Sequence, residues 1–205
     1  MKLALPTLAL ALAATTAAQY YNQSNPFHLV LVSKNKTING DTLSACHAGA
    51  AIESLCLTNS VSVSKPNPIA VGVFYFNTSD QVVTPNATLG APGILTYVLN
   101  ANPNIPESVG LYIDLTTNVA LPLLYPGDTL STTLAFDKNE LLNIQDYVDD
   151  TVNPPVAGDF EAYYRWYSCT TYYSGYEYVT LTWVLGKGKP QNPSCVKVDV
   201  KRKFI

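Results

Sequence analysis

A strictly alternating run near the C-terminus constrains the fold of this chain more than any other stretch. In residues 176–185 the side chains at odd positions are mostly apolar, and those at even positions are Tyr, Thr and Val. Because successive side chains of a strand point to opposite faces, the run predicts a strand with one core-facing side. That core-facing set is Val179, Leu181, Trp183 and Leu185. The even set would meet solvent or a second layer.

Two further strands are predicted beside this run. Residues 162–170 are rich in aromatic side chains, which favour a pleated, half-buried surface. Residues 171–175 separate the two strands, and Gly175 can adopt the positive φ that a hairpin turn requires. Close to the end of the chain, three valines alternate with charged residues in 196–201. The block therefore predicts a hairpin followed by a half-buried third strand.

The four cysteines predict two local disulfide bonds. Cys46 and Cys56 are close in sequence, whereas Cys169 and Cys195 bracket the C-terminal block. Four cysteines permit three pairings, and we expect Cys46–Cys56 and Cys169–Cys195. Free or metal-binding thiols are the alternative, but the spacings do not match a zinc pattern. An even number of cysteines is typical of a chain that folds in an oxidising compartment.

The N-terminal segment, residues 1–18, predicts export. Lys2 precedes an apolar run of Leu and Ala, and small residues, with Thr16 and Ala18, follow at the positions of a cleavage site. The run is too short to span a membrane, so we interpret it as a secretory signal peptide. A buried N-terminal helix is the alternative. The prediction leaves residues 19–205 as a single secreted β domain that begins at Gln19.

Four Asn-x-Ser/Thr tripeptides predict a glycoprotein. The acceptor positions are Asn22, Asn35, Asn77 and Asn86. All four lie in the first half of the chain. Glycans there would cover that half and leave the tyrosine-rich half free.

Composition and strand spacing predict the fold class. Only 13% of residues are charged, 47% are hydrophobic, and the net charge is −3, which is typical of a globular chain and gives no reason to expect nucleic-acid binding. Short apolar or alternating runs recur between Pro, Gly and Asn at 27–33, 69–76, 94–99, 109–115 and 129–136. Many short strands with turn signals predict an all-β, antiparallel β-sandwich, with a β-barrel as the alternative.

One or two short helices are expected within this fold. Residues 45–55 are rich in small side chains and predict a short helix or a tight loop spanned by the first disulfide bond. Residues 138–148 predict a second helix, because Asp137 can cap its N-terminus and Leu141, Ile144 and Val148 form one apolar stripe.

Two blocks of the sequence resemble a known group of proteins. They are Cys46-His47-Ala48-Gly49-Ala50-Ala51, and Trp183-Val184-Leu185-Gly186 followed by Asn192-Pro193-Ser194-Cys195. In these blocks the chain resembles a group of small secreted proteins of filamentous fungi. The resemblance implies a fungal exported protein without an assigned activity, and it implies no catalytic residues.

Catalytic patterns are weak in this sequence. There is no Gly-x-Ser-x-Gly elbow, and a catalytic triad would have to use His28 or His47. A glycoside hydrolase needs two carboxylates, for which the candidates are Asp114, Asp128, Asp159, Glu161 and Glu177. Asp146, Asp149 and Asp150 could ligate calcium, but they lack the pattern of a calcium loop and are interpreted as an acidic loop. We expect no metal and no cofactor.

Tyrosines of the C-terminal hairpin are the preferred binding residues. Their rings combine an apolar face with a polar tip, which suits sugars and protein partners. The predicted binding surface consists of Tyr172, Tyr173, Tyr176 and Tyr178, and ordinary sheet packing is the alternative. We therefore expect an extracellular or cell-wall-associated protein that binds a glycan or a protein partner, with no membrane span. A secreted polysaccharide hydrolase and a structural surface protein without a ligand are the alternatives.

Overall fold

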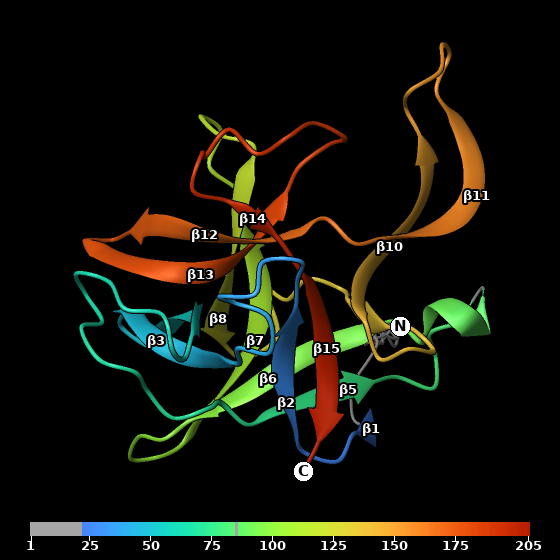
Figure 1. The fold of residues 1–205 in the computed structure, drawn as a ribbon. Coiled ribbons are helices and arrows are strands. Elements are labelled where there is room, and N and C mark those ends of the chain that lie inside the picture. The colour runs from blue at the N-terminus through green and yellow to red at the C-terminus, as the bar shows by residue number, and fades with distance from the viewer. Residues whose placement is uncertain (1–21, 85) are drawn as a thin grey trace, which may run out of the picture.

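An all-β architecture fills the described chain, residues 22–84 and 86–205 of the computed structural model (Figure 1). The strands are β1 (Asn22–Gln23), β2 (Phe27–Val32), β3 (Leu43–Gly49), β4 (Ile52–Leu57), β5 (Phe74–Thr78), β6 (Gly93–Leu99), β7 (Ile105–Tyr112), β8 (Val119–Pro126), β9 (Ala135–Phe136), β10 (Leu142–Asp149), β11 (Val156–Tyr163), β12 (Trp166–Tyr173), β13 (Tyr176–Val184), β14 (Val196–Lys197) and β15 (Asp199–Phe204). A short 3-10 turn, η1 (Ala87–Leu89), is the helical element that these residues contain. The predicted all-β antiparallel class is confirmed. The expected signal peptide, residues 1–18, and Gln19 lie outside the described residues.

One large antiparallel sheet forms the body of the protein. Its strand order is β14-β12-β13-β4-β8-β7-β6-β5-β2-β15, with β1 beside β5 and β3 beside β4. The two edge strands follow one another in the chain, because β14 ends at Lys197 and β15 begins at Asp199. Between them, the Val198 N–H donates to the Trp166 carbonyl at 3.2 Å. This short segment brings both edges together, so that the sheet nearly closes and both a barrel and a sandwich describe it. We call this body the barrel.

The inner face of the barrel holds the apolar core. The predicted core-facing set does pack there: Val179, Leu181 and Trp183 of β13, and Leu185 directly after it. Trp166 of β12 is fully buried, and its ring packs edge-on against Trp183 with centroids 4.7 Å apart. Its Nε1–H donates to the Leu142 carbonyl at 2.8 Å. The other face of β13 is also covered, since Thr180 and Thr182 are buried.

Both predicted disulfide bonds are present. Cys46–Cys56 links β3 to β4, and Cys169–Cys195 links β12 to the segment that precedes β14. Among the described residues no cysteine is free. The two bonds fit an extracellular protein. In the same part of the chain, no helix is long and apolar enough to cross a bilayer.

The prediction of a helix or tight loop at residues 45–55 is wrong. These residues form most of the β3–β4 hairpin, which turns at Ala51 with a φ of 50°. Small side chains such as Ala48 are buried on this hairpin. Pairing of β4 with β8 and β13 in the sheet therefore overrides the helical preference of alanine.

The predicted helix at residues 138–148 is a turn followed by β10. Asp137 does cap backbone N–H groups, since its Oδ1 accepts from Asn139 at 2.8 Å and from Leu141 at 2.9 Å. Glu140, however, has a φ of 67°, which a helix does not allow. The predicted apolar stripe is not kept, since Leu141 precedes β10 and Val148 is exposed. Leu142 and Ile144 share one face of β10 instead, and both reach the core.

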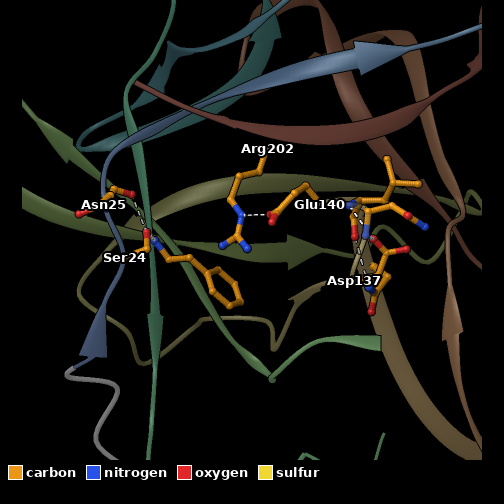
Figure 2. Close-up of polar contacts among 9 residues, drawn as sticks. Ser24, Asn25, Asp137, Glu140 and Arg202 are labelled. Atoms are coloured by element: carbon orange, nitrogen blue, oxygen red, sulfur yellow. Dashed lines mark hydrogen bonds and ion pairs between the residues drawn. The ribbon is translucent and has the colours of Figure 1, made fainter. Parts of the chain in front are cut away.

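The β10–β11 hairpin, residues 142–163, leaves the barrel as a long projection (Figure 1), and we call it the arm. Its base is held by Arg202 of β15. Figure 2 shows Arg202 directed at Glu140, with which it forms an ion pair. The Arg202 N–H also donates to the Glu140 carbonyl at 2.9 Å, and its guanidinium lies 4.4 Å from the centre of the Phe136 ring. The base is thus fixed, whereas the outer arm is exposed.

Candidate functional site

The tip of the tyrosine-rich hairpin is shorter than the sequence predicts. Ser174 and Gly175 form a two-residue turn, with φ values of 50° and 92°. Tyr172 and Tyr173 therefore lie on β12, opposite Glu177 and Tyr176 of β13, and not in the turn itself. The two positive φ values are typical of the tight turns that close hairpins.

The four hairpin tyrosines have different surroundings. Tyr178 is 6% exposed, and its hydroxyl donates to the His47 carbonyl at 2.7 Å. Tyr176 is half-buried, with its ring stacked on Tyr178 at 6.0 Å and edge-on to His47 at 5.2 Å. These two rings belong to a small core beside the Cys46–Cys56 disulfide.

The other two rings lie at the hairpin tip. Tyr173 is half-buried and packs edge-on against Tyr112, with centroids 5.0 Å apart. Burial first, and then the neighbouring Tyr173 hydroxyl, raise the pKa of Tyr125 to about 12, so these rings form a cluster. Only Tyr172, at 72% exposure, is fully available to a partner. The hairpin therefore does not present four coplanar, exposed rings.

A groove between the arm and the barrel is a concave surface of the described chain. It has a volume of about 640 Å³ and lies between the inner side of the arm and the end of β13. Its aromatic lining is Tyr147, Tyr163 and Trp183. Its carboxylates are Asp146, Asp149, Asp150, Asp159 and Glu161, and its cations are Arg165 and Lys187. We call this surface the arm groove.

The aromatic lining consists of a fixed floor and an open wall. Trp183 is buried against Trp166, and Tyr163 packs on the core, so both form the floor. The Arg165 guanidinium lies 4.6 Å from the centre of the Tyr163 ring, within the range of a cation–π contact. Tyr147, on the arm, is 53% exposed and supplies the open wall.

Two carboxylates of the arm groove lie directly opposite each other. Asp146 of β10 and Glu161 of β11 are register partners, so their side chains lie on the same face. Asp146 Oδ1 accepts the backbone N–H of Tyr147 at 2.7 Å and of Val148 at 3.3 Å, at the irregularity in the β10–β11 register. Like charges at such positions repel, and a ligand with polar hydrogens would reduce that repulsion.

Across the arm groove, Lys187 approaches the outer arm. Hydrogen bonds from Thr151, first from its side chain and then from its backbone, lower the pKa of Asp149, and the Lys187 charge lowers it further. Asp149 Oδ1 accepts from the Thr151 hydroxyl at 2.6 Å. The carboxylate is therefore ionised near neutral pH and faces a cation on the other side of the groove.

The predicted catalytic carboxylates are only partly brought together. Asp159 and Glu161 line the arm groove, whereas Asp114, Asp128 and Glu177 do not. Asp114 is used in its own turn, where it accepts from the Thr116 N–H and hydroxyl, and these bonds lower its pKa.

The acidic loop and the histidines show no metal site. In the described residues no group of three or more His, Cys, Asp or Glu side chains is arranged to hold a metal ion. His28 Nδ1 lies 2.9 Å from the Gly72 carbonyl, and His47 is in contact with Tyr176. Neither histidine lines the arm groove.

The sequon asparagines are mostly accessible. Asn22, Asn35 and Asn86 are exposed, and Asn77 is half-buried. Glycosylation at these positions stays a prediction.

Sequence reasoning missed several residues of the arm groove, chiefly Tyr147, Arg165 and Lys187. The one available signal was the acidic run of residues 146–150 followed by the exposed β11 sequence. A helix prediction for the same stretch concealed that signal.

A family model matches residues 24–204, nearly the whole described chain; its description is Domain of unknown function (DUF7907). The chain belongs to this family. No curated protein and no solved structure matches it. Membership of the DUF7907 family therefore places no activity on the arm groove.

Proposed function

We propose that this protein is a secreted fungal glycoprotein, extracellular or cell-wall-associated, that binds a glycan in the arm groove without cleaving it. One observation carries the proposal, namely an open groove of about 640 Å³ with aromatic rings and many hydrogen-bonding side chains. Aromatic faces cover the apolar faces of sugar rings, and carboxylates and cations bind their hydroxyls. This site replaces the hairpin as the main binding surface, and Tyr172 remains a second candidate.

Secretion and fungal origin rest on separate support. Two disulfide bonds fit an oxidising compartment, and the first residues have the pattern of a signal peptide. The resemblance of the cysteine-containing blocks to small secreted fungal proteins supports a fungal origin. Three sequon asparagines, Asn22, Asn35 and Asn86, are exposed and fit glycosylation.

A pull-down on insoluble chitin, β-glucan and cellulose tests the glycan proposal. We expect one of these polymers to retain the deglycosylated protein, and Tyr147→Ala to weaken retention about tenfold because the open aromatic wall is lost. Tyr172→Ala is the matched control, since it removes another exposed tyrosine ring, 72% exposed against 53% for Tyr147, that lies outside the groove. Retention lost with Tyr172→Ala alone would move the site to the hairpin. Failure of all three polymers to retain the protein would favour a protein partner or a purely structural role.

A secreted polysaccharide hydrolase is the second candidate, because Asp146, Asp159 and Glu161 share the arm groove. A hydrolase needs one carboxyl that stays protonated as the acid, and burial is the usual means of achieving this. All three side chains are exposed, which favours binding over cleavage. The same tubes would be assayed for release of reducing sugar. Release by the wild type that is lost in Glu161→Gln would favour the hydrolase over the binding protein.

A further inference from the structure

Two glutamates are buried inside the barrel, away from the arm groove. Glu53 of β4 is 3% exposed and Glu107 of β7 is 1% exposed. Each glutamate lies two positions before a core residue of its own strand, Leu55 on β4 and Val109 on β7. Both glutamates therefore share the inward face of their strand. The two carboxyls interact with one another, and no other group of the described chain donates a hydrogen bond to Glu53 Oε2 or to either oxygen of Glu107.

The neighbouring elements supply no cation for this pair. On β6 the register partner of Glu107 is Tyr97, and on β8 the partners are Pro126 for Glu107 and Leu124 for Glu53. On β3 the partner of Glu53 is His47, whose side chain is exposed. Neither glutamate forms an ion pair within the described residues, and no cluster suited to a metal ion exists there.

An unpaired charge in such a site is costly, and two adjacent carboxylates cannot both ionise there without a large penalty. A proton bound by one carboxyl removes one charge and supplies the missing donor to the other. The pair with one proton, in which one carboxyl donates a hydrogen bond to the other, satisfies more of its oxygen atoms than the doubly ionised pair does.

We propose that Glu53 and Glu107 form a buried proton-binding site, which holds the β4–β8–β7 region closed while one proton is bound and loosens it when that proton leaves. Burial first, and then the hydrogen bond and charge of Glu53, raise the pKa of Glu107 to about 8. Burial, followed by the charges of Glu107 and Glu53, also raises the pKa of Tyr97.

Tyr97 marks the route by which water would enter. Its ring packs on Phe74 with centroids 5.7 Å apart, and it also lines a surface groove with Gly72 and Tyr75. It thus lies between the buried pair and solvent. Once Glu107 ionises, water would hydrate the carboxylate from this side as the β4–β8–β7 region loosens.

The direction of the pH effect follows from linkage. In the unfolded chain Glu107 releases its proton near its ordinary pKa of 4.5, whereas in the folded chain it retains the proton up to about 8. The folded state therefore binds more protons between these values, and stability falls as pH rises. The stabilisation is complete below about pH 4.5 and is lost through pH 8, with the folding constant decreasing about tenfold per pH unit.

Denaturant unfolding of the full domain at pH 5, 6, 7 and 8 tests this proposal. The wild type should lose about tenfold in folding constant per pH unit. Glu107→Gln imitates the protonated form and should remove most of this dependence. Asp128→Asn, which neutralises an exposed carboxylate, is the control and should retain the wild-type slope.

Glu53→Gln separates the two causes of the raised pKa of Glu107, which are burial and the interaction with Glu53. It leaves Glu107 buried but removes the adjacent charge, so the pH dependence should persist and move to lower pH. Equal slopes for the wild type and Glu107→Gln would overturn the proposal. If Glu107→Gln fails to fold, carbon NMR of labelled glutamate in the wild type decides: one carboxyl titrating near pH 8 supports the proposal, and none titrating above pH 6 refutes it.

Discussion

The barrel and the arm are both built from antiparallel strands but differ in how much of each is buried. In the barrel both faces of β13 are covered, and Trp166 and Trp183 pack against each other in its core. In the arm, most of β11 and the outer half of β10 are exposed. The barrel is thus stabilised by burial, whereas the arm depends on strand pairing, local caps and the Glu140–Arg202 ion pair at its base.

This difference shows where the chain has freedom to carry function. A projection that buries little apolar area contributes little to stability, so its side chains need another explanation. The arm carries the carboxylates and Tyr147 that face the arm groove. The barrel contributes the groove floor through Trp183 and one cation through Lys187. We interpret the barrel as a rigid support and the arm as its binding element.

Among the substitutions that test this comparison, Trp166→Ala in the barrel should cause the largest loss of unfolding free energy. The substitution empties a fully buried site and leaves the Leu142 carbonyl without its donor, so we expect a loss of about 3–5 kcal/mol in unfolding free energy. Urea unfolding measures this loss. Tyr172→Ala, which truncates an exposed ring on the same strand, should change stability by less than about 0.5 kcal/mol. Equal losses for the two variants would contradict the assignment of the core.

Glu161→Gln should have the smallest effect on the unfolding free energy, and any change should be stabilising, opposite to that of Trp166→Ala. Removing one of two opposed like charges should leave stability unchanged or raise it by at most about 0.5 kcal/mol. The same unfolding experiment, repeated at low and high salt, measures the change, which should shrink as salt screens the repulsion. A marked destabilisation would show that Glu161 makes a structural contact in the arm.

Sequence patterns predicted the parts of the fold that depend on local chemistry. The alternation in β13, the turn at Gly175 and both disulfide bonds could be predicted because each depends on neighbouring residues. β2 and β6 were also found within a residue or two. The confirmed features are therefore local ones, namely period-two alternation, a turn glycine, and cysteines that pair with their nearest partner in the sequence.

Features fixed by distant packing could not be predicted in this way. The strand β8 contains Pro122 inside a ladder, which argues against a strand in local terms, yet β4 and β7 flank it. Within residues 138–148 the spacing of Leu141, Ile144 and Val148 fits a helix, yet the chain forms β10 and places Leu142 and Ile144 on its core-facing side. Burial of Glu53 and Glu107 depends on strands far apart in the sequence, so composition gave no sign of it.

Hydrogen–deuterium exchange tests most directly whether the arm, and not the tyrosine-rich β12–β13 hairpin, binds the ligand. The unmodified protein would be measured with and without a soluble oligosaccharide of whichever polymer retains it. The account predicts slower exchange in residues 142–163 and around Lys187, with residues 166–176 unchanged. Protection confined to the hairpin tip around Tyr172, or no protection in the arm at saturating oligosaccharide, would contradict it.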